Sequence, residues 1–133
     1  MTSLAATQSA GKTLVIFDDE EDILTICSYI LTEQGWTVHT FTDCEHILDK
    51  LANINPEVIF MDNWIPKEGG IIATQTLKKS ADYCQVPVVY FSANADIASL
   101  AKSAGADAYL AKPFELDELA AVIERVTKVA KLK

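Results

Sequence analysis

The sequence predicts an α/β fold in which a parallel, doubly wound sheet of five strands is covered by helices on both faces. Five apolar, strand-like segments alternate with five helix-like segments over the 133 residues. The strand-like segments are rich in Val, Ile and aromatic residues and mostly lack polar alternation, as expected of parallel strands that are buried on both faces. Short connections between the alternating elements favour right-handed crossovers within one domain.

Each expected strand is a short apolar run that ends at a polar or turn-forming residue. The third is the most hydrophobic, with the run VIFM at residues 58–61 directly before Asp62. The expected strands are Thr13–Phe17, Thr37–Thr40, Glu57–Met61, Val86–Phe91 and Asp107–Leu110. Five strands are too few for a closed eight-stranded barrel, so an open sheet is expected.

The first helix is expected over Asp22–Glu33, because Gly35 suits the position just after a helix C-terminus. Its buried face is expected to comprise the apolar residues at i, i+3, i+4 and i+7 spacing, which are Ile23, Ile26, Cys27 and Ile30. Leu24 and Tyr29 fall outside this face and are therefore expected at the surface.

The remaining helices are placed by capping residues, glycines and a proline. The second is expected to be capped by Asp43, the third to follow Gly69-Gly70, the fourth to run from Asp96 to Gly105, and the fifth to run from Glu115 to Val129 after Pro113. The acidic start and the lysine-rich end of the fifth helix suit the helix dipole.

The composition indicates a globular protein and excludes several functions. The formal net charge is −8, which argues against direct nucleic-acid binding because phosphate backbones are bound through clustered Lys and Arg. The three cysteines are widely spaced and form no CxxC pair, so neither a disulfide framework nor a zinc site is indicated. No apolar run approaches the ~20 residues of a membrane span. A cytoplasmic protein without membrane contact is therefore expected.

Both ends of the chain are expected to lie outside the folded domain. Residues 1–11 are rich in small residues and lack the pattern of a signal peptide, so they are interpreted as a disordered tail. The domain itself is expected over residues 12–130, followed by a short basic tail at 131–133. No attached DNA-binding or catalytic output domain is expected.

Reactive or charged side chains follow four of the five expected strands. The first strand is followed by Asp18 and Asp19, the third by Asp62, the fourth by Ser92 and the fifth by Lys112. In a doubly wound sheet the carboxyl ends of the strands form one edge, and ligands bind there. Taken singly, the acids could be helix caps, the serine a turn residue and the lysine a surface charge. Their common placement favours a functional site.

Three carboxylates brought together at that edge would repel one another. At a separation of ~4 Å and an effective dielectric of ~20, each pair costs about 4 kcal/mol. Either one carboxyl stays protonated or a cation lies among them. Oxygen ligands with room for water and a phosphate suit Mg²⁺, so the sequence predicts a magnesium site with a lysine at its rim.

Four segments of the chain resemble the receiver domain of two-component response regulators. They are VIFDDEEDI, VIFMDNWIPKEGG, PVVYFSAN and AGADAYLAKPF, which begin at residues 15, 58, 87 and 104 and occur in the family's order. The resemblance covers nearly all of the chain from Lys12 to Val129 and is to the single-domain, chemotaxis-regulator-like members. It implies the flavodoxin-like strand order 2-1-3-4-5 with five flanking helices.

The resemblance implies a role for each residue at the strand ends. Asp62 matches the aspartate that accepts a phosphoryl group. Asp18 and Asp19 match the acidic pair that binds Mg²⁺ together with Asp62 and a backbone carbonyl two residues beyond it. Ser92 and Lys112 match the residues that hold the phosphoryl oxygens.

Further roles follow from the same resemblance. Trp64 would supply the carbonyl ligand. Its side chain and that of Asn94 would border the phosphoryl group, so the pair is hypothesised to set the lifetime of the acyl phosphate. The alternative for Trp64 is simple packing at the surface. Tyr109 matches the aromatic switch residue, which acts with Ser92, and the peptide bond before Pro113 is expected to be cis.

The resemblance implies a phospho-acceptor switch that catalyses only its own phosphorylation and dephosphorylation and is not an enzyme with a separate substrate. Its expected partners are a sensor histidine kinase or phosphotransfer protein, docked through exposed Leu24 and Tyr29, and an unidentified downstream protein that contacts the fourth helix, fifth strand and fifth helix. A phosphorylation-dependent dimer is a further expectation. The alternatives are an interaction module that needs no phosphorylation, and a Mg²⁺-dependent phosphohydrolase, for which Trp64 stands where a second aspartate is required.

Overall fold

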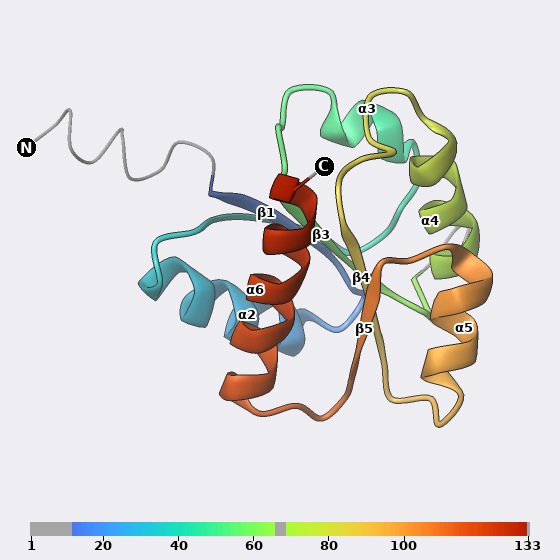
Figure 1. Cartoon of the computed structure of the whole chain (residues 1–133). Coiled ribbons are helices and arrows are strands. Elements are labelled where there is room, and N and C mark those ends of the chain that lie inside the picture. The colour runs from blue at the N-terminus through green and yellow to red at the C-terminus, as the bar shows by residue number, and fades with distance from the viewer. Residues whose placement is uncertain (1–11, 66–68, 133) are drawn as a thin grey trace, which may run out of the picture.

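A computed structural model describes residues 12–65 and 69–132, and in this part of the chain five parallel strands form one sheet (Figure 1). The strands are β1 (Thr13–Phe17), β2 (Thr37–Phe41), β3 (Val58–Asp62), β4 (Val88–Ser92) and β5 (Ala108–Ala111). Their order across the sheet is β2-β1-β3-β4-β5, and every neighbouring pair is parallel. The predicted fold class and strand order are confirmed.

Helices cover both faces of this sheet. Figure 1 shows α2 and α6 on one face and α3, α4 and α5 on the other. The helices are α2 (Glu21–Glu33), α3 (Ile47–Leu51), α4 (Gly69–Lys79), α5 (Ile97–Ala104) and α6 (Leu116–Leu132). None of the described helices is long and apolar enough to cross a membrane.

The two faces of the sheet are packed into two separate apolar cores. Along β1, Leu14 and Ile16 pack on the side of α2 and α6, whereas Val15 and Phe17 pack on the side of α3, α4 and α5. Successive residues of a strand point to opposite faces, so a strand covered on both sides buries every side chain. This is why the central strands are continuous apolar runs in the sequence.

The buried face of α2 differs from the predicted one. Its buried residues are Leu24, Cys27 and Leu31, with Ile23 and Ile30 partly buried beside them. Ile26 is 54% exposed, so its predicted burial is wrong, as is the predicted exposure of Leu24. Apolar residues stand next to each other at 23–24 and 30–31, so the helical spacing of apolar residues is satisfied by two different helix faces. One face contains Ile23 and Ile30 and the other contains Leu24 and Leu31, and the two are rotated by about 100° about the helix axis. Tyr29 is exposed as predicted.

Two predicted boundaries are also wrong. Asp43 does not cap α3, which begins at Ile47. The Oδ1 atom of Asp43 accepts hydrogen bonds from the Glu45 N–H at 3.0 Å and from Lys50 Nζ at 2.9 Å. Asp43 therefore stabilises the turn before α3. At the other end, α6 continues to Leu132, so residues 131 and 132 extend this helix where a tail was predicted. The predicted tail at residues 1–11 lies outside the described residues, as does residue 133.

Candidate functional site

Asp62 is the last residue of β3, the central strand of the sheet. The apolar run before it forces this strand into the interior, so its carboxylate is carried to the carboxyl edge with only 5% of the residue exposed. Its Oδ2 atom accepts a hydrogen bond from the Trp64 N–H at 3.2 Å, which closes the turn that follows the strand. Oδ1 lies 3.0 Å from Lys112 Nζ.

Asp18 is carried to the same edge by the neighbouring strand. It directly follows β1, which pairs with β3 in parallel, and it is fully buried. Its Oδ1 atom accepts a hydrogen bond from the Glu20 N–H at 2.9 Å, and its Oδ2 atom lies 2.6 Å from Lys112 Nζ. Asp18 and Asp62 therefore share one ammonium group, although they lie 44 positions apart in the sequence.

Lys112 reaches this pair from the far edge of the sheet, just after β5. Its side chain is 9% exposed, and its Nζ atom lies 4.6 Å from the centroid of the Phe91 ring, a cation–π distance. Glu20 adds a third carboxylate, with Oε1 3.4 Å from the same nitrogen. The peptide bond between Lys112 and Pro113 is cis.

Asp19 forms a group of three carboxylates with Asp18 and Asp62. Ligand oxygens of Asp18, Asp19 and Asp62 all lie within 4.8 Å of one another, and Asp19 is the exposed member. These donors are hard oxygens, with one side of the group open to solvent, which is the donor set that Mg²⁺ prefers when it keeps several waters. The three aspartates fit a Mg²⁺ site by this chemistry.

Burial and charge at the site act against the ionised carboxylates. Burial is the main cause that raises the pKa of Asp62 above its usual value, the charge of Asp18 adds to this rise, and the hydrogen bond from Lys112 opposes it. The pKa of Asp18 is also raised, mainly by burial, again with Lys112 opposing. Burial alone would lower the pKa of Lys112, but its hydrogen bonds to the two aspartates outweigh burial and raise it. One lysine thus compensates the buried acids only in part, and a cation at this group would relieve the rest.

Ser92 is the last residue of β4 and is buried beside this group. In register, Asp62 pairs with Phe91, so Ser92 lies one position further along the adjacent strand. The Ser92 hydroxyl oxygen accepts a hydrogen bond from the Asn94 N–H at 3.0 Å, and its carbonyl accepts one from the Lys112 N–H at 2.9 Å. The serine therefore fixes the backbone of both neighbouring site segments.

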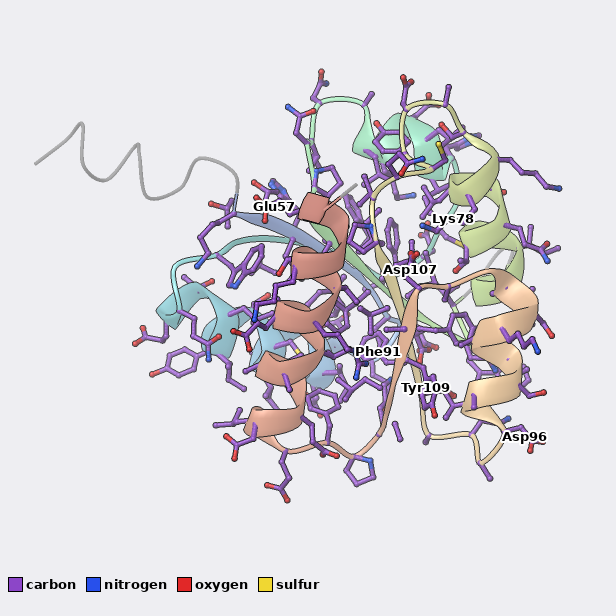
Figure 2. The ribbon with its side chains drawn as sticks, viewed as in Figure 1. Glu57, Lys78, Phe91, Asp96, Asp107 and Tyr109 are labelled. Atoms are coloured by element: carbon purple, nitrogen blue, oxygen red, sulfur yellow. The ribbon has the colours of Figure 1, made fainter. Side chains whose placement is uncertain are left out.

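The other predicted site residues lie further out. Trp64 is 72% exposed, Asn94 is exposed, and Tyr109 on β5 is 47% exposed, with its ring turned to solvent beside α5 (Figure 2). The structure thus brings Asp18, Asp19, Asp62 and Lys112 into one group with Ser92 beside it. It leaves the side chains of Trp64, Asn94 and Tyr109 at the surface around it.

Four contacts of the site were not predicted. They are the approach of Glu20 to Lys112, the Phe91 ring beneath the lysine, the hydrogen bond from the Tyr90 hydroxyl to Asn63, and the close packing of Gly70 on Asp62. Only the glycine had a signal in the sequence, since a Gly-Gly pair after a strand marks a close backbone approach. The others depend on side chains that reach across strands, which the spacing of residues along the chain does not reveal.

Comparison with known proteins connects this geometry to one family. The profile of the response regulator receiver domain matches residues 14–124. Protein PilG of Pseudomonas aeruginosa is 30% identical over 119 residues, which cover 88% of this chain and 88% of that protein. The regulatory protein AtoC of Escherichia coli is 29% identical over 127 residues, or 94% of this chain, but the chain spans only 27% of its length.

Solved structures share the fold. A putative response regulator from Chloroflexus aurantiacus superposes with a TM-score of 0.82 at 25% identity, covering 88% of this chain and 98% of that one. The receiver domain of the sensor histidine kinase PA1611 from Pseudomonas aeruginosa has a TM-score of 0.81 at 25% identity, covering 90% of this chain and 99% of that one. The latter structure contains a magnesium ion coordinated in its active site cleft.

Proposed function

The chain belongs to the response regulator receiver domain family, and from this membership we propose that it is a phospho-acceptor switch of a two-component system. Receiver domains are signalling switches, generally not enzymes in the usual sense, and they interact with histidine kinases or phosphotransfer proteins. The observation that carries the proposal is the convergence of two buried aspartates, Asp18 and Asp62, on Lys112 at the carboxyl edge of the sheet.

The proposed reaction takes place at the Asp62 carboxylate. One carboxylate oxygen attacks the phosphorus of a phosphohistidine, so an O–P bond forms as the N–P bond breaks and the imidazole leaves. Lys112 and the Ser92 hydroxyl stabilise charge on the transferred oxygens. The product is a labile acyl phosphate, which suits a reversible signal. In the dephosphorylation step water attacks the phosphorus, the O–P bond to Asp62 breaks and inorganic phosphate leaves, so the carboxylate is restored and no separate substrate is turned over.

The proposed cofactor is Mg²⁺, held by Asp18, Asp19 and Asp62 with the backbone carbonyl of Trp64. When bound, the ion neutralises carboxylate charge and orients the phosphoryl oxygens. The carboxyl oxygens within 4.8 Å of one another support this assignment. So does the coordinated magnesium ion of the PA1611 receiver domain.

We assign the response to phosphorylation to Ser92 and Tyr109. The new group brings a charge of roughly −1.5 to −2 and new acceptor oxygens. A hydrogen bond from the Ser92 hydroxyl to the phosphoryl group would draw the loop after β4 inward and make room for Tyr109 to turn in. The surface of α5, β5 and α6 would then change its affinity for an unidentified downstream protein, or for a second copy of the chain.

We propose that Trp64 and Asn94 set the lifetime of the acyl phosphate by screening it from water. Both are exposed and lie two residues beyond Asp62 and Ser92 respectively. Trp64→Ala and Asn94→Ala are expected to change the rate at which the phosphorylated protein returns to its unmodified mass. Tyr29→Ala removes an equally exposed aromatic ring on α2 and serves as the control. Decay rates equal to that of the wild type in both variants would refute this role.

The phosphodonor is proposed to dock on α2. Since Leu24 is buried, the exposed apolar residues available there are Ile26 and Tyr29, at 54% and 69% exposure. The double variant Ile26→Asp, Tyr29→Asp is expected to slow transfer from a cognate kinase while leaving phosphorylation by acetyl phosphate unchanged. Equal loss with both donors would point to damage of the site and count against docking. The cytoplasm is the proposed location, and the proposed domain runs from residue 12 to the end of α6 at Leu132.

The core of the proposal is tested by weighing the intact protein. Incubation with acetyl phosphate or phosphoramidate and Mg²⁺ is expected to add ~80 Da, the mass of one phosphoryl group. The gain should disappear with EDTA and in Asp62→Asn. A protein that binds Mg²⁺ but gains no mass would leave the phosphorylation-independent interaction module as the better description. Steady release of phosphate from a generic phosphatase substrate would favour the phosphohydrolase.

A further inference from the structure

Tyr90 lies in the middle of β4 and is fully buried, yet its hydroxyl reaches the segment that follows Asp62. Its ring belongs to the core on the side of α3, α4 and α5. In the sheet Tyr90 pairs with Met61, the residue before Asp62. Its hydroxyl donates a hydrogen bond to Oδ1 of Asn63, the residue after Asp62. The side chain therefore spans the strand end that carries the central aspartate.

The backbone around Asn63 is held at two further points. The Gly70 N–H, in the first turn of α4, donates a hydrogen bond to the Asn63 carbonyl at 3.2 Å. Gly70 also packs so closely that a Cβ atom there would lie 2.2 Å from the Asp62 carbonyl oxygen and 3.0 Å from the Asn63 Cα. On the other side, the Trp64 N–H donates to Asp62 Oδ2 at 3.2 Å. The Tyr90 hydroxyl ties the Asn63 side chain to the neighbouring strand.

A phenylalanine would fill the same core space as the Tyr90 ring. A buried tyrosine hydroxyl costs free energy unless it finds a partner, and here the partner is the Asn63 side chain. What this bond fixes is the peptide segment between Asp62 and Trp64.

We propose that Tyr90 is a positioning residue that anchors Asn63 and thereby holds the Trp64 carbonyl in place to bind Mg²⁺. This inference rests on the proposed function and deepens it. A ligand atom from a loop backbone is only as well placed as the residues beside it, and such supporting hydrogen bonds tune metal affinity. The phosphoryl-transfer groups themselves, on Asp62 and Lys112, are positioned by their own strands.

The test is the Mg²⁺ affinity of Tyr90→Phe, measured by isothermal titration calorimetry with MgCl₂. We expect the Kd to rise about three- to tenfold, the effect of one lost hydrogen bond. At saturating Mg²⁺, the rate of phosphorylation by acetyl phosphate should stay within about twofold of the wild type, because the ion is then bound in both proteins. A merely structural role would not separate affinity from rate in this way.

Tyr83→Phe is the matched control. Its hydroxyl donates a hydrogen bond of 2.8 Å to the Leu51 carbonyl, away from the site, so the variant loses an equivalent interaction. Its Mg²⁺ affinity is expected to equal that of the wild type. Asn63→Ala provides a second variant at a half-buried position and should weaken Mg²⁺ binding as much as Tyr90→Phe. The double variant should be no weaker than either single one, because both remove the same bond.

Three outcomes would overturn the inference while leaving the proposed function intact. The first is a wild-type Kd in Tyr90→Phe, and the second is a double variant in which the two losses multiply. The third is a slower phosphorylation rate at saturating Mg²⁺, since Tyr90 would then act on the transfer step. A wild-type protein that binds no Mg²⁺ would overturn the proposed function and this inference together.

Discussion

Asp18 and Asp62 are buried against one ammonium group, that of Lys112. The cost of burying two carboxylates, less the compensation by this lysine, decides how stable the site is without a cation. Burial raises the pKa of both carboxyls, so ionising either one lowers the stability of the folded state. Lys112 offsets this cost through contacts of 2.6 and 3.0 Å. A buried ion pair adds little net stability by itself, but removing one partner leaves an uncompensated charge. Lys112 is therefore expected to stabilise the fold in addition to its proposed role in phosphoryl transfer.

Lys112→Met is expected to destabilise the protein by about 2–4 kcal/mol near neutral pH in EDTA, as measured by urea unfolding. The loss should shrink as the pH is lowered. A carboxyl whose folded-state pKa is raised takes up its proton in the folded state before it does so in the unfolded chain. The penalty is therefore complete at a pH above the folded-state pKa. It is relieved as the pH falls from the folded-state pKa to the lower pKa of the unfolded chain.

Lys50→Met is the control for this prediction. Its Nζ atom lies 2.9 Å from Asp43 Oδ1, but this pair is more exposed, with side-chain accessibilities of 24% and 35%. Its loss should cost at most about 1 kcal/mol. If the cost of Lys112→Met stayed constant or grew on acidification, the buried carboxylates would not be its cause.

The sequence predicted the charged members of the site because each follows a strand. Strand ends meet at one edge whatever the details of packing, so Asp18, Asp62 and Lys112 could be placed together from topology alone. The contact of Tyr90 with Asn63 could not, because it depends on how far a core ring reaches across the sheet. A tyrosine in an apolar run looks like any other core aromatic.

At the level of elements, the strands were placed to within about two residues, whereas one helix was assigned the wrong buried face. In α2 the adjacent apolar pairs at 23–24 and 30–31 satisfy the helical period in two ways. The choice between them is made by the shape of the core, where Leu24 is buried and Ile26 is not. Periodicity along one chain carries no information about that shape.

The junction of β3 with α4 supplies an element-scale prediction. Gly70→Ala would place a Cβ atom 2.2 Å from the Asp62 carbonyl oxygen, so backbone must move. We expect a loss of about 1–3 kcal/mol in thermal or urea unfolding, as for an overpacked core site, together with weaker Mg²⁺ binding. The cause of both effects would be displacement of the strand end that carries the aspartate.

Gly69→Ala is the matched comparison. Gly69 has a φ of 80°, which strains an alanine, but among the described residues, chain neighbours aside, no atom would lie within 4 Å of its Cβ. Its cost should be only about 1 kcal/mol, without an effect on Mg²⁺ binding. Equal effects of the two substitutions would show that backbone strain, and not the clash with Asp62, governs this junction.

Across the whole molecule, the two edges of the sheet carry different kinds of ionic contact. At the amino edge, Lys78 of α4 lies 2.6 Å from Asp107, which also accepts a hydrogen bond from the Val88 N–H at 2.8 Å (Figure 2). This pair ties α4 to β4 and β5 with charges matched one to one. At the carboxyl edge, Lys112 contacts the carboxylates of Asp18, Glu20 and Asp62, and Asp19 adds a fourth carboxylate beside Asp18 and Asp62. An excess of carboxylates over ammonium groups therefore lies where the proposed cation binds.

This imbalance predicts that Mg²⁺ stabilises the whole domain, because the segments after β1 and β3 both contribute ligands and are held together by the ion. At a concentration about tenfold above its Kd, the ion should add about 1.4 kcal/mol to the free energy of unfolding, which raises Tm by several degrees.

Asp19→Asn should remove most of this shift while leaving the Tm in EDTA nearly unchanged, since Asp19 is exposed. Asp96→Asn removes one exposed carboxylate next to α5, outside the aspartate group, and should keep the full shift. Because NaCl at equal ionic strength screens surface charge without binding the three aspartates, it should raise Tm less than MgCl₂ does. An equal rise with both salts, or an equal rise in Asp19→Asn, would mean that screening of the net charge, and not a bound ion, stabilises the fold.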